Sequence, residues 1–192
     1  MISVIKYNAG NIGSITNALK RLNADVIVTD DPKLIQKADK VILPGVGEAK
    51  SAMNSLKSCG LDTIIPKLKQ PFLGVCLGLQ LLCDYSDEGN TKCLGVIQEQ
   101  VHKFPPLGKI PHMGWDDFTD IRGSLFEGID PQDDMYYVHS YYATTGANTI
   151  GTCNYLINFS AALQRDNFFA VQFHPEKSAQ VGSRMLKNFL SL

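Results

Sequence analysis

The sequence lacks the features that mark several large classes of protein. Its 18 Lys and Arg against 19 Asp and Glu give a net charge of -1, so we expect no basic surface for nucleic acid or a membrane. No apolar run approaches the roughly 18 residues of a membrane-spanning helix. The first residues have the pattern of a strand and not of a signal peptide. These absences predict a soluble protein of the cytoplasm.

Cysteine and histidine do not occur in the arrangements that form disulfide frameworks or bind metals. The five cysteines include no C-x-x-C pair, and the four histidines show no metal-ligand spacing. The turn with Gly10 and Gly13 does not have the G-x-G-x-x-G spacing of a dinucleotide site, and there is no P-loop. We therefore expect no metal and no cofactor.

An alternation of strands and helices fills the first half of the chain. Short apolar runs at Ile2–Lys6, Asp25–Val28 and Lys40–Leu43 predict strands, and apolar residues at helical spacing follow the first of them. Strand-like segments from residue 135 to residue 164 predict an antiparallel extension. Three prolines between Phe104 and Trp115 predict an irregular loop. The expected fold is one α/β domain, residues 1–192, with a mainly parallel sheet flanked by helices.

The segment Pro71–Leu82 has the clearest chemical pattern. A buried-strand pattern ends at Cys76, and a helical pattern starts at once with no loop residues between them. The run Gly74–Gly78 has the G-x-nucleophile-x-G form of a nucleophile elbow, in which small residues let strand and helix pack around a sharp turn. A helix N-terminus favours an anion and hence the Cys76 thiolate. The N–H of Leu77 can hold a developing oxyanion.

The segment Phe168–Glu176 can supply the other catalytic groups. It reads as a buried strand that stops at Pro175. Residues two apart in extended backbone project to the same side, so Glu176 can fix the tautomer of His174. The other ring nitrogen is then free to take the thiol proton. An inert buried Cys76 and a histidine that merely ends a strand are the structural alternatives. We favour the catalytic interpretation because the two motifs occur together.

The runs Gly74–Gln80 and Gln172–Glu176 resemble the class I glutamine amidotransferases, a family that hydrolyses glutamine with a Cys-His-Glu triad and passes the ammonia on. The resemblance implies the family's flavodoxin-like α/β fold, L-glutamine as the substrate, and a triad of Cys76, His174 and Glu176. The residues that it implies for stabilising the oxyanion are Leu77, Val46 and Gly47. Those that it implies for binding glutamine are Gly45, Gln80, Ser140 and Tyr141.

Four further runs are similar to one branch of the family, the glutaminase subunits of imidazole glycerol phosphate synthase. They are residues 7–14, 43–47, 109–115 and 137–141. The branch implies a heterodimer with a (β/α)₈-barrel cyclase subunit in histidine biosynthesis. It also implies that the Pro44–Gly47 loop turns over, on a signal from the partner, to offer the Val46 amide to the oxyanion. The partner contacts that it implies are Asn11, Met113, Trp115, Tyr136 and Lys177.

Three other functions fit the same residues. A class I amidotransferase subunit serving another synthase would share the triad but bind a different partner. A stand-alone cysteine hydrolase would work at full rate without a partner. A non-catalytic regulatory subunit would not react at Cys76 with an electrophilic glutamine analogue.

Overall fold

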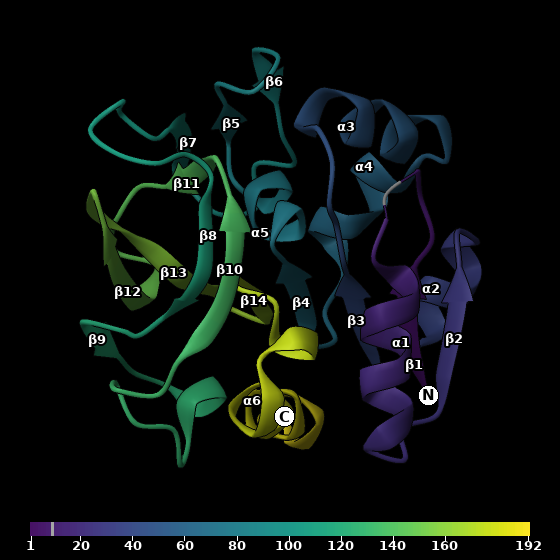
Figure 1. The fold of residues 1–192 in the computed structure, drawn as a ribbon. Helices are drawn as coiled ribbons and strands as arrows, with labels where there is room; N and C mark the ends of the chain where they lie inside the picture. The colour runs from purple at the N-terminus through teal and green to yellow at the C-terminus, as the bar shows by residue number, and fades with distance from the viewer. Residues whose placement is uncertain (9) are drawn as a thin grey trace.

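The computed structural model describes residues 1–8 and 10–192. Its centre is an eight-stranded sheet in the order β2-β1-β3-β4-β14-β13-β12-β9 (Figure 1). The strands are β1 (Ile2–Ile5), β2 (Val26–Thr29), β3 (Lys40–Leu43), β4 (Phe72–Val75), β5 (Tyr85–Ser86), β6 (Thr91–Lys92), β7 (Gln100–Lys103), β8 (His112–Asp116), β9 (Asp120–Ile121), β10 (Met135–His139), β11 (Tyr141–Ala143), β12 (Thr149–Tyr155), β13 (Ile157–Arg165) and β14 (Phe168–Val171). The helices are α1 (Ile12–Arg21), α2 (Pro32–Lys37), α3 (Ala49–Ser58), α4 (Leu61–Ile64), α5 (Leu77–Leu82) and α6 (Ala179–Ser191), with the 3₁₀ helices η1 (Ile65–Lys67), η2 (Ser124–Phe126) and η3 (Pro175–Lys177).

The sheet has a parallel half and an antiparallel half. The strands β2, β1, β3, β4 and β14 run parallel, and β13, β12 and β9 continue the sheet antiparallel. Every residue of β1, β4 and β14 is buried, as expected of parallel strands whose two faces are both covered. The predicted α/β fold with an antiparallel extension is confirmed.

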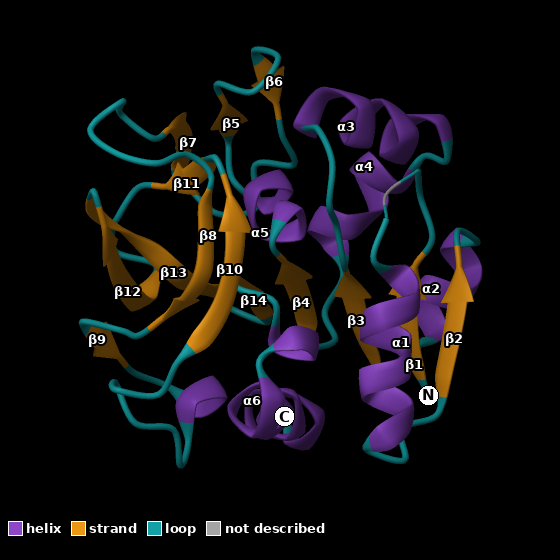
Figure 2. Ribbon diagram, viewed as in Figure 1, coloured by secondary structure: helices purple, strands orange, loops and turns teal. Residues whose placement is uncertain are grey.

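Helices cover both faces of the sheet, and each face has its own buried apolar cluster. Val4 of β1 belongs to one cluster, with Leu19 of α1 and Phe189 of α6. Its neighbour Ile5 belongs to the other cluster, with Leu56 of α3, because successive strand residues point to opposite faces. Figure 2 shows α1 in front of the sheet and α2 behind it. No helix in the described part of the chain is long and apolar enough to cross a membrane.

The segment predicted as a loop between Phe104 and Trp115 is only partly irregular, and that prediction is wrong for its second half. Residues His112–Asp116 form β8, which pairs antiparallel with β10. The prolines that exclude regular structure end at Pro111. After it, Met113 and Trp115 face outward while His112 is buried, which is the alternation of a strand with one covered face.

The strand that precedes the His-Pro-Glu motif is shorter than predicted. It ends at Val171, not at Pro175, because its neighbour β4 ends at Val75 and its pairing with β13 also stops at Val171. Residues Pro175–Lys177 form η3. Glu176 therefore reaches its neighbouring histidine from a helical turn and not from extended backbone.

Candidate active site

Cys76 occupies a sharp turn between β4 and α5. Its backbone has φ 54° and ψ -107°, a strained conformation for a residue with a side chain, and its N–H donates to the Val171 carbonyl at 2.8 Å. A Cβ atom at Gly74 would overlap the Gly78 carbonyl, and one at Gly78 would overlap the Leu43 carbonyl. The glycines therefore let strand and helix approach closely, and the turn has the geometry of a nucleophile elbow.

His174 and Glu176 form a buried pair. The Nδ1 atom of His174 lies 2.8 Å from Oε1 of Glu176, and both side chains are fully buried. The Asn11 amide donates to the same Oε1 at 2.5 Å and lies 3.3 Å from Nδ1 of His174. Since the carboxylate accepts, Nδ1 carries the hydrogen. Nε2 of His174 is buried and has no hydrogen-bond partner among the described residues, so it is available for proton transfer.

The neighbours of this pair keep it charged. Burial lowers the pKa of His174, but Cys76 and Glu176 outweigh burial and raise this pKa to about 9. Burial raises the pKa of Glu176, yet the bonds from His174 and Asn11 prevail and lower it. At neutral pH the ring therefore holds a proton beside an ionised carboxylate. Such a ring can give its proton to a leaving group.

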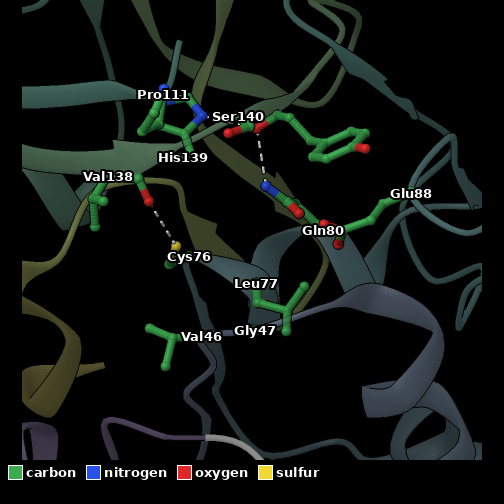
Figure 3. Close-up of a pocket in the computed structure, with 11 residues that line it drawn as sticks. Val46, Gly47, Cys76, Leu77, Gln80, Glu88, Pro111, Val138, His139 and Ser140 are labelled. Atoms are coloured by element: carbon green, nitrogen blue, oxygen red, sulfur yellow. Dashed lines mark hydrogen bonds between the residues drawn. The ribbon is translucent and has the colours of Figure 1, made fainter.

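A cavity of about 340 Å³ opens beside Cys76, a size typical of small-molecule sites. Figure 3 shows the side chains around it. The lining residues predicted from sequence are Val46, Gly47, Cys76, Leu77, Gln80, Ser140 and Tyr141, and the additional ones are Glu88, Pro111, Val138 and His139. Gly45, His174 and Glu176 do not line it. The cavity therefore lies between the elbow, the Pro44–Gly47 loop, which we call the glycine loop, and the end of β10.

Glu88 is the one acidic residue among those lining the cavity. Its Oε2 accepts from the Ala49 N–H at 2.7 Å, and burial raises its pKa although this bond opposes the shift. The sequence holds no signal that separates Glu88 from the neighbouring acids Asp84 and Asp87, because only the folded chain brings one of them to the cavity.

Gln80 is buried and bonded to the cavity wall. Its Nε2 donates to the Tyr141 carbonyl at 3.0 Å and to the Gln172 side chain at 3.0 Å. Both hydrogens of the amide are therefore used within the protein. The group that Gln80 can still offer to a ligand is its carbonyl oxygen, which accepts hydrogen bonds.

A carbonyl group of the glycine loop occupies one of the predicted oxyanion donors, the N–H of Leu77. The Leu77 N–H donates to the carbonyl oxygen of Gly45 at 3.3 Å, and the Tyr7 hydroxyl anchors the loop by donating to the Pro44 carbonyl at 2.6 Å. Gly47 has φ 118°, which favours glycine. The loop has to release the Leu77 amide before that amide can hold an oxyanion.

Four of the five residues predicted to contact a partner lie in one outward-facing cluster. Met113 and Trp115 are 55% and 53% exposed. The Trp115 ring packs edge-to-face against the Tyr136 ring, with 5.9 Å between the ring centres. Nζ of Lys177 lies 5.6 Å from the centre of the Tyr136 ring. These four form an outward-facing cluster next to the His174–Glu176 pair, which we call the β8–β10 face. Asn11 is half-buried and contacts Glu176 and His174, so its partner contact stays a prediction.

A second group of titratable side chains lies at the cavity wall, where His139 is one of the lining residues. His112 and His139 face each other across β8 and β10, with Nδ1 of His112 3.1 Å from Nε2 of His139. Nδ1 of His139 donates to the Tyr141 carbonyl at 2.8 Å, so its Nε2 is the acceptor when the ring is neutral. Burial lowers the pKa of His139 to about 3, and the ring is therefore uncharged at neutral pH.

His139 should make the protein less stable in mild acid. A histidine in an unfolded chain has a pKa of about 6.5, above the folded value of about 3. Below pH 6.5 the unfolded chain therefore binds more protons, and the free energy of unfolding falls with pH by up to about 1.4 kcal/mol per unit. Urea unfolding should show this loss between about pH 7 and about pH 5.

The substitution His139→Gln should reduce that loss, because glutamine can still donate to the Tyr141 carbonyl but does not titrate. The matched control is His102→Gln, which changes an exposed histidine and should leave the loss as in the wild type. Equal losses in all three proteins would show that His139 is not the group responsible.

Comparison with known proteins shows which sequences and folds are similar. The family model "Glutamine amidotransferase class-I" matches residues 3–192. The chain is 50% identical over 194 residues to "Imidazole glycerol phosphate synthase subunit HisH" of Bacteroides fragilis, covering 100% of this chain and 99% of that protein. It is 44% identical over 202 residues to "Imidazole glycerol phosphate synthase subunit HisH 1" of Methanococcus maripaludis, covering 100% of both.

Two solved structures share the fold. A crystal structure of a glutamine amidotransferase matches with a TM-score of 0.73 at 18% identity, over 99% of this chain and 97% of that chain. A glutamine amidotransferase from Thermotoga maritima matches with a TM-score of 0.67 at 18% identity, over 99% of this chain and 82% of that chain.

Proposed function

Because the chain belongs to the class I glutamine amidotransferase family, we propose that residues 1–192 are one amidotransferase domain, the glutaminase subunit of an imidazole glycerol phosphate synthase in histidine biosynthesis. It hydrolyses glutamine and passes the ammonia to a cyclase subunit. What supports this proposal is that Cys76 lines a cavity of about 340 Å³ and is close enough to the ring of the buried His174–Glu176 pair to raise the pKa of His174.

The triad provides a two-step route for hydrolysis. The Cys76 thiolate attacks the side-chain amide carbon of glutamine, and His174 gives its proton to the departing nitrogen, so ammonia leaves and a thioester remains. His174, held by Glu176, then takes a proton from water, and the hydroxide attacks the thioester. Glutamate leaves and Cys76 is restored. The raised pKa of His174, about 9, keeps it protonated for the first of these steps at neutral pH.

The cavity offers groups that complement the rest of glutamine. The Glu88 carboxylate can pair with the α-ammonium group, and the free oxygen of Gln80 can accept a further N–H from the substrate. Ser140 and Tyr141 also line the cavity. Once the glycine loop turns over, the amides of Leu77 and Val46 or Gly47 converge on the oxyanion.

The relatives are named as subunits of imidazole glycerol phosphate synthase, which supports a second subunit as the partner, and we propose that this partner is the cyclase. We assign the β8–β10 face as its docking surface, because exposed Trp, Tyr and Met side chains are enriched at interface centres and because this face adjoins the triad. The cyclase is a (β/α)₈ barrel in a cytoplasmic heterodimer with this chain. Ammonia released at a closed interface stays unprotonated and can react in the partner's site.

The experiment that tests this function combines the chain with a candidate cyclase and its phosphoribulosyl-formimino substrate. We expect glutamine-dependent formation of imidazole glycerol phosphate and aminoimidazole carboxamide ribotide. Trp115→Ala should weaken the complex while leaving the triad in place. Full-rate hydrolysis without a partner would indicate a stand-alone hydrolase, and coupling only to another synthase would refute the assignment to this pathway.

A further inference from the structure

Gln172 is a buried residue beside the nucleophile that the mechanism above does not use. In the parallel pairing of β4 and β14, Val171 lies opposite Val75, so the next residues, Gln172 and Cys76, are neighbours. Backbone bonds of 2.8 Å from Gln172 to the Ala161 carbonyl and from Cys76 to the Val171 carbonyl hold both in place. The Gln172 side chain is 0% exposed, and its Nε2 lies 3.6 Å from the Cys76 sulfur.

A chain of hydrogen bonds fixes which end of the Gln172 amide faces the sulfur. The backbone carbonyl of Tyr141 can only accept, so the Gln80 group 3.0 Å from it is the NH₂. The same NH₂ lies 3.0 Å from the Gln172 side chain and needs an acceptor there, which is Oε1. Nε2 of Gln172 must then point at Cys76. The opposite orientation would set two NH₂ groups against each other.

Besides the His174 ring, whose pKa Cys76 raises, the sulfur has one acceptor and one donor within reach among the described residues. The Val138 carbonyl lies 3.9 Å away (Figure 3) and can accept from the S–H of the thiol. The thiolate has no hydrogen to give, but it can accept from Nε2 of Gln172, and a hydrogen bond to the charged form of a group favours that form. The amide of Gln172 thus distinguishes the reactive state from the resting thiol.

We infer that Gln172 is a further catalytic residue, whose amide N–H donates to the Cys76 sulfur and stabilises the thiolate that attacks glutamine. This inference deepens the proposed function and rests on it. Gln172 does not line the cavity in the described structure, so it has no direct part in holding glutamine. Its loss should lower kcat and leave KM almost unchanged.

Gln172→Glu is the sharpest test, because it keeps an oxygen for Gln80 and replaces the N–H that faces the sulfur with an oxygen. The rate of alkylation of Cys76 by iodoacetamide is followed against pH on the isolated chain, with mass spectrometry to separate Cys76 from the other cysteines. We expect the half-maximal rate to move upward by about one pH unit or more. In the complex, kcat should fall about 10- to 100-fold.

Two further variants make the result decisive. Gln172→Met removes the donor without adding an oxygen and should shift the alkylation profile in the same direction, so it replaces Gln172→Glu if a buried carboxyl prevents folding. Gln180→Glu makes the same exchange at an exposed position and should behave as wild type. A wild-type alkylation profile and kcat in the folded Gln172 variants would overturn the role of Gln172. Loss of hydrolysis in Cys76→Ala would still support the proposed function.

Discussion

Replacing Cys76 with alanine is expected to abolish glutamine hydrolysis in the complex. Removing the nucleophile of a catalytic triad in another hydrolase class lowers kcat by about 10⁶, and no other cysteine lines the cavity in the described structure. The measurement is glutamate release by the purified complex. The fold should survive, because alanine occupies less space than cysteine at the same turn.

The control for this prediction is Cys59→Ala, which removes a half-buried thiol from the residue after α3. It should hydrolyse glutamine at the wild-type rate. Substantial hydrolysis by Cys76→Ala, or an equal loss in Cys59→Ala, would show that the elbow thiol is not the nucleophile.

The isolated chain should hydrolyse glutamine about 10²- to 10³-fold more slowly than the complex with cyclase and its ligand. The reason is the bond from the Leu77 N–H to the Gly45 carbonyl, which removes one oxyanion donor in the structure described. Losing such a donor costs about 10² to 10³ in kcat. The measurement is the glutaminase rate with and without the partner.

Tyr7→Phe tests whether the loop is the cause of the low rate. The Tyr7 hydroxyl anchors the loop through the Pro44 carbonyl at 2.6 Å, and a neutral hydrogen bond contributes about 1 kcal/mol. The variant should therefore raise the rate of the isolated chain about fivefold and leave the rate of the complex nearly unchanged. An isolated wild-type chain as fast as the complex would contradict a closed oxyanion site.

The elbow and the His-Pro-Glu motif can be predicted from sequence because each is local. The strand pattern before Cys76, the glycines around it and the helix pattern after it lie within a few residues. His174 and Glu176 are also near neighbours, although the turn that joins them is a 3₁₀ helix and not the predicted strand. Spacing along the chain therefore predicts that His174 and Glu176 form a pair, but it does not predict the backbone conformation that brings them together.

The contacts that support the triad could not be predicted, because they join distant parts of the chain. Asn11 and Glu176 are 165 residues apart in sequence, and Gln80 and Gln172 are 92 apart. The resemblance places Asn11 at the partner, yet its amide donates to the Glu176 carboxylate, the proposed third member of the triad. An asparagine at the start of a helix is usually a cap, but the side chain of Asn11 makes no capping bond.

The strand β8 shows how a local rule fails. Prolines before His112 predict irregular backbone, and they do not reveal that β10 pairs with the residues after them. This pairing places Met113 and Trp115 on an outward face and His112 inside. The position of the proposed partner surface, the β8–β10 face, thus depends on a contact between strands that sequence patterns do not report.

Labelling with an electrophilic glutamine analogue tests the central claim most directly. The chain has five cysteines, so the other four serve as controls within one molecule. We predict one equivalent of label, on Cys76 alone, with glutamine protecting and with much slower labelling when His174 is replaced by alanine. Label on Cys59 or no label at all, in a folded chain bound to its cyclase, would contradict a triad of Cys76, His174 and Glu176.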